Sequence, residues 1–125
     1  MDARFDLANL VDGALCAPAG GAWLDVHEPA TGAAYARCPD SDARDVEAAV
    51  AAARRAAPAW AALPARERAR HLQRLADAVE ARLDELAREE SRDSGKPVAL
   101  ARSVDIPRAV ANLRCFAEAI TQCPG

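Results

Sequence analysis

Two different spacings of apolar residues divide the chain. Residues 9–16 are two short runs of alternating apolar and polar residues around an Asp-Gly pair, a pattern typical of a tight β-hairpin. Residues 22–27 and 33–38 are two further runs, and turns rich in Pro and Gly separate them. The first segment, residues 1–41, is therefore predicted to form a short β-meander.

From residue 42 onward, apolar residues recur every three or four positions, which is the spacing of an amphipathic helix. Asp42 is placed to cap the first helix, and Pro58 is expected to end or kink it. The apolar stripe predicted for this helix consists of Val46, Ala49, Val50, Ala53, Ala57 and Trp60. An amphipathic stripe of this kind must meet a partner surface.

A second and a third helical region follow. Pro64 opens a helix expected to run to about Ser91, and a Gly-Lys-Pro sequence at 95–97 stops it. Its predicted stripe consists of Leu72, Leu75, Ala76, Val79, Leu83 and Leu86. A third helical region over residues 98–120 is expected to be kinked or broken near Pro107, and the residues expected to face inward on it are Val110, Leu113, Phe116 and Ala117. The expected class is α+β, mostly helical, with residues 1–41 and 42–125 forming one incomplete domain.

The composition favours helices over a large apolar core. Hydrophobic residues make up 51% of the 125 residues, but aromatic residues make up only 4%, and 33 residues are alanine. Alanine is the best helix former and buries little apolar area. The net charge of −3 disfavours a nucleic-acid partner. No apolar run is long enough to span a membrane, and without an apolar signal core a cytoplasmic location is expected.

No residue pattern forms a recognisable active site. The sequence has no Gly-rich phosphate loop and no Cys-x-x-Cys pair, so no catalytic or cofactor-binding residue is assigned. The two histidines, His27 and His71, are expected at the surface. Cys115 is expected to pack on its helix. The four cysteines are expected to be free thiols in a reducing compartment, and they are Cys16, Cys38, Cys115 and Cys123.

The order of several short sequences along the chain is more informative than any single one. Glu-Pro-Ala-Thr-Gly at 28–32 is followed by Pro-Ala-Arg-Glu-Arg at 64–68, Asp-Ser-Gly-Lys-Pro at 93–97 and Asp-Ile-Pro-Arg at 105–108. The ordered set resembles the N-terminal region of the NAD(P)-dependent aldehyde dehydrogenase superfamily over nearly the whole chain. Residues 99–108 look most like the branch of 2-aminomuconic and hydroxymuconic semialdehyde dehydrogenases.

The resemblance implies an enzyme that oxidises an aldehyde to the carboxylate with NAD or NADP. In that family the nucleophilic cysteine, the glutamate base and the phosphate-binding glycine loop lie downstream of the matched region. This chain alone is therefore expected to be inactive and to bind no cofactor. Its expected partner is the remainder of an aldehyde dehydrogenase, or a second copy through self-association. The alternative is a stand-alone helical protein-interaction module that reuses this scaffold.

The resemblance also implies one ligand role, in a structural monovalent-cation site. Family members supply a backbone oxygen just before the Pro-x-Thr-Gly turn and an Asp before Gly-Lys-Pro. These positions correspond to His27, with Val26 adjacent, and to Asp93. Oxygen ligands suit a hard cation. The family's remaining ligand lies beyond the matched region, so the site would be incomplete, and Asp93 could instead be an ordinary helix-end residue.

Overall fold

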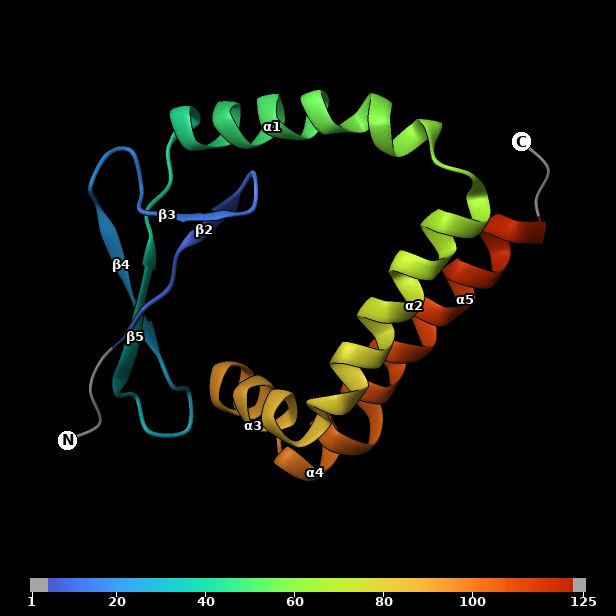
Figure 1. Cartoon of the computed structure of the whole chain (residues 1–125). Helices are drawn as coiled ribbons and strands as arrows, with labels where there is room; N and C mark the ends of the chain where they lie inside the picture. The colour runs from blue at the N-terminus through green and yellow to red at the C-terminus, as the bar shows by residue number, and fades with distance from the viewer. Residues whose placement is uncertain (1–4, 123–125) are drawn as a thin grey trace. The chain divides into compact units, whose positions relative to one another are not determined.

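The structure, a computed structural model, describes residues 5–122. The chain divides into two compact units, Met1–Ala59 and Trp60–Gly125. Short strands come first and helices follow, with 63% of the structure helical (Figure 1). The predicted α+β, mostly helical class is confirmed. The assignment of residues 1–41 and 42–125 to two segments of one domain stays a prediction.

A β-hairpin forms where the Asp-Gly pair predicts it. Strand β2 (Asn9–Val11) pairs antiparallel with β3 (Ala14–Cys16). Asp12 and Gly13 connect them, and both have positive φ angles, 54° and 77°. A two-residue turn with positive φ at both positions matches the twist of the strands, and Asp and Gly are among the residues that tolerate it best.

A separate three-stranded sheet has the order β1-β5-β4. Strand β4 (Trp23–His27) is antiparallel to β5 (Ala34–Pro39), and β1 (Phe5–Asp6) is parallel to β5. The described strands therefore form two sheets rather than one continuous meander. Strand β1 was not predicted, because two residues are too few to show an alternating pattern. Arg37 anchors it through an ion pair with Asp6, with 2.7 Å between Nη2 and Oδ2.

Helix α1 (Ala43–Ala62) begins at the predicted cap. Asp42 Oδ1 accepts a hydrogen bond from Arg44 N at 2.8 Å, while Asp42 N donates to Asp45 Oδ2 at 3.0 Å. These reciprocal bonds satisfy amides that the helix itself leaves unpaired. The helix does not end at Pro58 but continues to Ala62. The other expected outcome, a bend at this proline, stays a prediction.

The prediction of a single helix from Pro64 to Ser91 is wrong, because the helix is interrupted at Arg82. Helix α2 (Ala65–Ala81) ends there and α3 (Leu83–Ser94) begins immediately afterwards. The backbone of Arg82 leaves the helical region, with φ −109° and ψ 20°. The apolar spacing continues across this break, so periodicity alone could not reveal it. Gly95, with φ 77°, ends α3 as expected.

The break expected near Pro107 takes the form of a wide helical turn. Helix α4 (Val98–Leu100) leads into η1 (Ala101–Asp105), a π-helical segment, and then into α5 (Ile106–Gln122). A π turn inserts one extra residue per hydrogen-bonded turn. We infer that this wider turn relieves the clash that the Pro107 ring would otherwise make with the preceding turn.

Alanine forms most of the core within the described residues. Besides Pro18, the buried apolar residues are Ala36, Ala52, Ala69, Ala76, Ala87, Ala101, Val110 and Ala117. Helices α2 and α5 lie side by side and run in opposite directions (Figure 1), and Ala76 and Val110, buried on these two helices, are 0% and 3% exposed. The expectation that Phe116 faces inward is wrong, since it is 67% exposed and Val110 and Ala117 occupy the buried side of α5. The stripe predicted for α1 is also exposed, with Val46 at 58% and Trp60 at 45%.

Candidate functional site

The Gly-Lys-Pro turn between α3 and α4 is held by a lysine bridge. Lys96 Nζ lies 2.8 Å from Asp105 Oδ2 and 3.0 Å from Glu90 Oε1. Ser91 Oγ donates a hydrogen bond to Lys96 O at 2.6 Å. Hydrogen bonds to Asp105, and then to Glu90, raise the pKa of Lys96 above its ordinary value. The lysine therefore stays charged and acts as a brace between α3 and η1, not as a base or nucleophile.

The residues proposed as cation ligands fall in different units. Val26 and His27 are neighbours on β4, at a shift in the register between β4 and β5, and His27 is exposed as expected. Asp93 is exposed in the last turn of α3, where it has an interaction partner. Across residues 5–122, no group of three His, Cys, Asp or Glu side chains could hold a metal ion. The cation site therefore stays a prediction.

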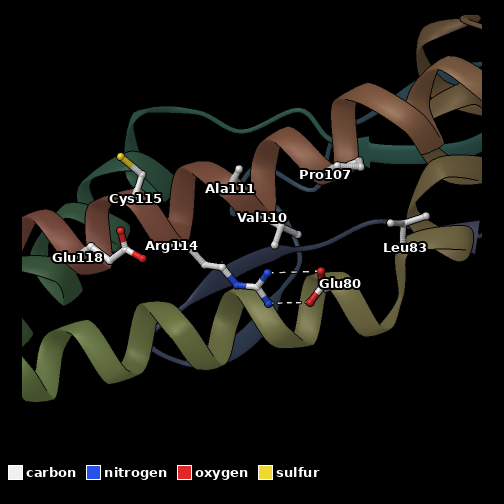
Figure 2. Close-up of a pocket in the computed structure, with 8 residues that line it drawn as sticks. All are labelled: Glu80, Leu83, Pro107, Val110, Ala111, Arg114, Cys115 and Glu118. Atoms are coloured by element: carbon white, nitrogen blue, oxygen red, sulfur yellow. Dashed lines mark hydrogen bonds and ion pairs between the residues drawn. The ribbon is translucent and has the colours of Figure 1, made fainter.

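A groove of about 450 Å³ lies along α2 and α5 (Figure 2). The residues that line it are Glu80, Leu83, Pro107, Val110, Ala111, Arg114, Cys115 and Glu118. Arg114 Nη2 lies 2.6 Å from Glu80 Oε2 and 3.0 Å from Asp77 Oδ1. Hydrogen bonds to these carboxylates, first Glu80 and then Asp77, raise the pKa of Arg114. The guanidinium joins α5 to α2, and an anionic ligand would have to displace two carboxylates to reach it.

The thiol in this groove lacks the groups that nucleophilic catalysis needs. Cys115 is a free cysteine and is exposed, so the expectation that it packs is wrong. The reason is its position on α5, from which its side chain points away from α2 (Figure 2). A thiol nucleophile is normally activated by an adjacent base, and no histidine lines this groove. Cys16 and Cys38 are free as expected, and Cys123 lies outside the described residues.

The N-terminus of α1 does not offer the free backbone amides that hold the phosphates of a dinucleotide. Such phosphates bind to free backbone amides at a glycine-rich helix N-terminus. At the N-terminus of α1, the carboxylate of Asp42 already accepts the amide of Arg44. A side-chain atom placed on nearby Gly20 would meet Asp42 Oδ2 at 3.2 Å and Arg44 Nη2 at 3.3 Å, two groups that are already paired with each other. Gly13 and Gly32 have positive φ and lie in turns.

Sequence comparison extends these observations. The sequence model of the Aldehyde dehydrogenase family matches residues 17–125. The chain is 51% identical over 98 residues to 2-aminomuconic semialdehyde dehydrogenase of Bos taurus, covering 78% of this chain and 20% of that protein. It is 39% identical over 114 residues to 2-hydroxymuconic semialdehyde dehydrogenase of Pseudomonas sp. (strain CF600), covering 90% of this chain and 24% of that protein.

Solved structures agree with the sequence relatives. The crystal structure of PnpE in complex with nicotinamide adenine dinucleotide matches with a TM-score of 0.93 and 39% sequence identity. The match covers 95% of this chain and 24% of PnpE. The chain thus spans between a fifth and a quarter of the length of the relatives it matches. Within residues 5–122, no helix has both the length and the apolar character needed to cross a membrane.

Proposed function

Because the chain belongs to the aldehyde dehydrogenase family, we propose that it serves as the N-terminal scaffold of an NAD(P)-dependent enzyme that oxidises an aldehyde to the carboxylate. The observation that carries this proposal is the match to PnpE, in which 95% of this chain aligns with 24% of a longer protein that binds nicotinamide adenine dinucleotide. A structural role for this chain is supported by the groove at Cys115, which no histidine lines, and by the N-terminus of α1, whose Arg44 amide is already capped by Asp42.

The proposed substrate is a muconic semialdehyde. The support comes from relatives named for 2-aminomuconic and 2-hydroxymuconic semialdehydes, at 51% and 39% identity. The substrate pocket itself would be built by the remaining polypeptide. The same holds for the thiolate that attacks the aldehyde, the base that activates water, and the groups that hold NAD or NADP.

In the reaction, this chain would hold other elements in position and would not supply a reacting group. The brace formed by Lys96, Glu90 and Asp105 joins α3 to η1 across the Gly-Lys-Pro turn. The Arg114 clamp holds α5 against α2. Rigid supporting elements matter to catalysis, because small displacements of a reacting group cost large factors in rate.

A monovalent-cation site is part of the same proposal. Val26 or His27 would supply a backbone oxygen and Asp93 a carboxylate, with the remaining ligand outside this chain. In an enzyme assembled from this chain and a complementary segment, the melting temperature should be higher in sodium chloride than in choline chloride at equal ionic strength. Asp93→Asn should remove that difference. An equal difference in the variant would rule Asp93 out as a ligand.

A reconstitution assay tests the proposed function. The purified chain, incubated with NAD and 2-hydroxymuconic semialdehyde, should produce no NADH. Co-expression with the complementary segment of bovine 2-aminomuconic semialdehyde dehydrogenase, which begins after the matched region, should produce a complex that forms NADH. Turnover by the chain alone would contradict the scaffold role.

The exposed apolar residues in both units also suit the alternative of a stand-alone interaction module. That alternative predicts a defined, unrelated binding partner and no association with the complementary segment. The reconstitution assay therefore separates the two functions.

A further inference from the structure

The pair of helices α2 and α5 has one polar flank. Arg114 on α5 reaches Glu80 and Asp77 on α2, so these three residues mark the same side of the pair. The groove with Cys115 and Glu118 lies on this side (Figure 2). The flank is therefore charged, and its cation is already neutralised by carboxylates of the same chain.

The opposite flank is apolar. An α-helix turns by about 100° per residue, so Leu113, Phe116 and Ile120 lie together on the side of α5 away from Arg114. The same rotation places Leu72, Leu75 and Val79 on the side of α2 away from Glu80 and Asp77. Because the helices run in opposite directions (Figure 1), these two sets line the same side of the pair. We call these six residues the Leu75–Phe116 face.

The centre of the Leu75–Phe116 face is open to solvent. Phe116 is 67% exposed and Leu75 is 50% exposed, while the neighbouring Leu113 and Ile120 are half-buried. None of the six side chains carries a charge or a hydrogen-bonding group, so covering the face requires no polar desolvation. Helices α2 and α5 already pack against each other. An apolar surface that extends beyond this contact is typical of helices that also pack against a further element.

We propose that the Leu75–Phe116 face is the docking surface for the remaining polypeptide of an aldehyde dehydrogenase, an inference that rests on the proposed function. PnpE matches this chain with 24% of its length, so most of such an enzyme is available to cover the face. Large exposed apolar residues also occur on other elements of both units, including Leu10 and Val46 in the first unit and Leu100 in the second. This wide distribution fits a large partner that contacts many elements.

A second copy of the chain fits the face less well. Two helices side by side over two turns present roughly 300 Å². A stable interface buries about 800 Å² on each partner. A symmetric dimer through this face alone would therefore be too small, and it would leave the apolar residues of the other unit uncovered.

The test is binding of the tagged, full-length chain to the complementary segment of bovine 2-aminomuconic semialdehyde dehydrogenase. Phe116→Asp should weaken binding at least about tenfold, as expected when a charge replaces an apolar anchor. Phe116→Leu, which keeps the side chain apolar, should bind within about threefold of the wild type. Gln122→Glu adds a negative charge at an exposed polar position of the same helix and should bind like the wild type.

Each outcome bears on the proposal. If Phe116→Asp retains wild-type binding, the face is not the docking surface, although the proposed function still stands. If the wild-type chain fails to bind the segment, both the proposed function and this inference fail. If the wild type forms dimers that Phe116→Asp abolishes while segment binding is unchanged, the occupant is a second copy. Circular dichroism of Phe116→Asp should match the wild type, because the replaced ring is mostly exposed.

Discussion

Helix α1 and the α2–α5 pair have the same apolar spacing but differ in what covers it. On α1, Val46, Val50 and Trp60 are 58%, 44% and 45% exposed. In the pair, Ala76 and Val110 are 0% and 3% exposed. Apolar residues at helical spacing therefore predict a helix and its apolar side, whereas burial of that side requires a partner of matching shape. Alanine on α2 and α5 lets the two backbones approach closely, whereas on α1 the residue that is buried is Ala52 and the large apolar side chains stay exposed.

The exposure of α1 and the close packing of α2 against α5 also determine how stable the isolated chain is. Buried alanines remove little apolar area from water, so the pair depends on many short contacts between closely packed helices. With large apolar residues left exposed in both units, the isolated chain is expected to be marginally stable, and to self-associate or depend on a partner. A monodisperse monomer with a sharp cooperative melt would contradict this expectation.

The largest predicted effect comes from a charge placed in the seam of the pair. Ala76→Asp should destabilise the second unit by roughly 3 kcal/mol, because a carboxylate would be buried without a partner. The matched variant Ala57→Asp, at an exposed position of α1, should cost less than about 1 kcal/mol through helix propensity. Urea titration followed by far-ultraviolet circular dichroism measures both. Equal losses in the free energy of unfolding for the two variants would mean that Ala76 and Ala57 are equally buried.

A milder truncation tests the same contrast by loss of packing. Val110→Ala should cost roughly 2 kcal/mol, since it removes two buried methyl groups and leaves a cavity. Val50→Ala on α1 should change the free energy of unfolding by less than about 0.5 kcal/mol, because that side chain is 44% exposed. A large loss for Val50→Ala would show that α1 is covered in solution, for example by a second copy.

The charged flank of the pair should contribute less than its buried seam. Arg114→Met removes the guanidinium that joins α5 to Glu80 and Asp77 but keeps an apolar stem. The urea midpoint should fall by less than for Val110→Ala, because the ion pairs are largely exposed. The deficit should shrink as salt is added, since salt screens the wild-type pairs. A deficit that is independent of salt would point to packing by the arginine stem instead.

The smallest predicted effect concerns pH at the start of α1. The side-chain hydrogen bond with Arg44 lowers the pKa of Asp42 below its ordinary value of 3.8. A carboxyl whose pKa is lowered by folding adds stability above its unfolded pKa and loses it as the pH falls through the folded value. The cap should therefore weaken only at acid pH below about 4. A carboxyl NMR titration should give a midpoint below 3.8 for Asp42, and Arg44→Met should raise it.

Local signals predicted much of the secondary structure. The Asp-Gly pair predicted the hairpin, Asp42 predicted the start of α1, and Gly95 predicted the end of α3. Each of these acts through the backbone conformation or hydrogen bonding of a few neighbouring residues. The break at Arg82 carries no comparable signal, because arginine is a good helix former and the apolar spacing runs through it.

The candidate site was less accessible to sequence reasoning. The brace formed by Lys96, Glu90 and Asp105 joins residues up to fifteen positions apart, and nothing in the spacing of their charges distinguishes them from an ordinary solvated surface. Cys115 was expected to pack, and its exposure depends on which side of α5 faces α2. The short sequences, by contrast, identified the family. Their order along the chain carries information that the amino-acid composition does not contain.

The linear order of residues was enough to predict the hairpin, the start of α1, the end of α3, and membership of the aldehyde dehydrogenase family. Tertiary structure alone decided which apolar stripes are buried, that Arg114 joins α2 to α5, and that Phe116 remains exposed. The physical reason is the separation along the chain of the residues that interact. Caps and turns depend on neighbouring backbone groups, whereas burial depends on surfaces that meet only after the chain has folded.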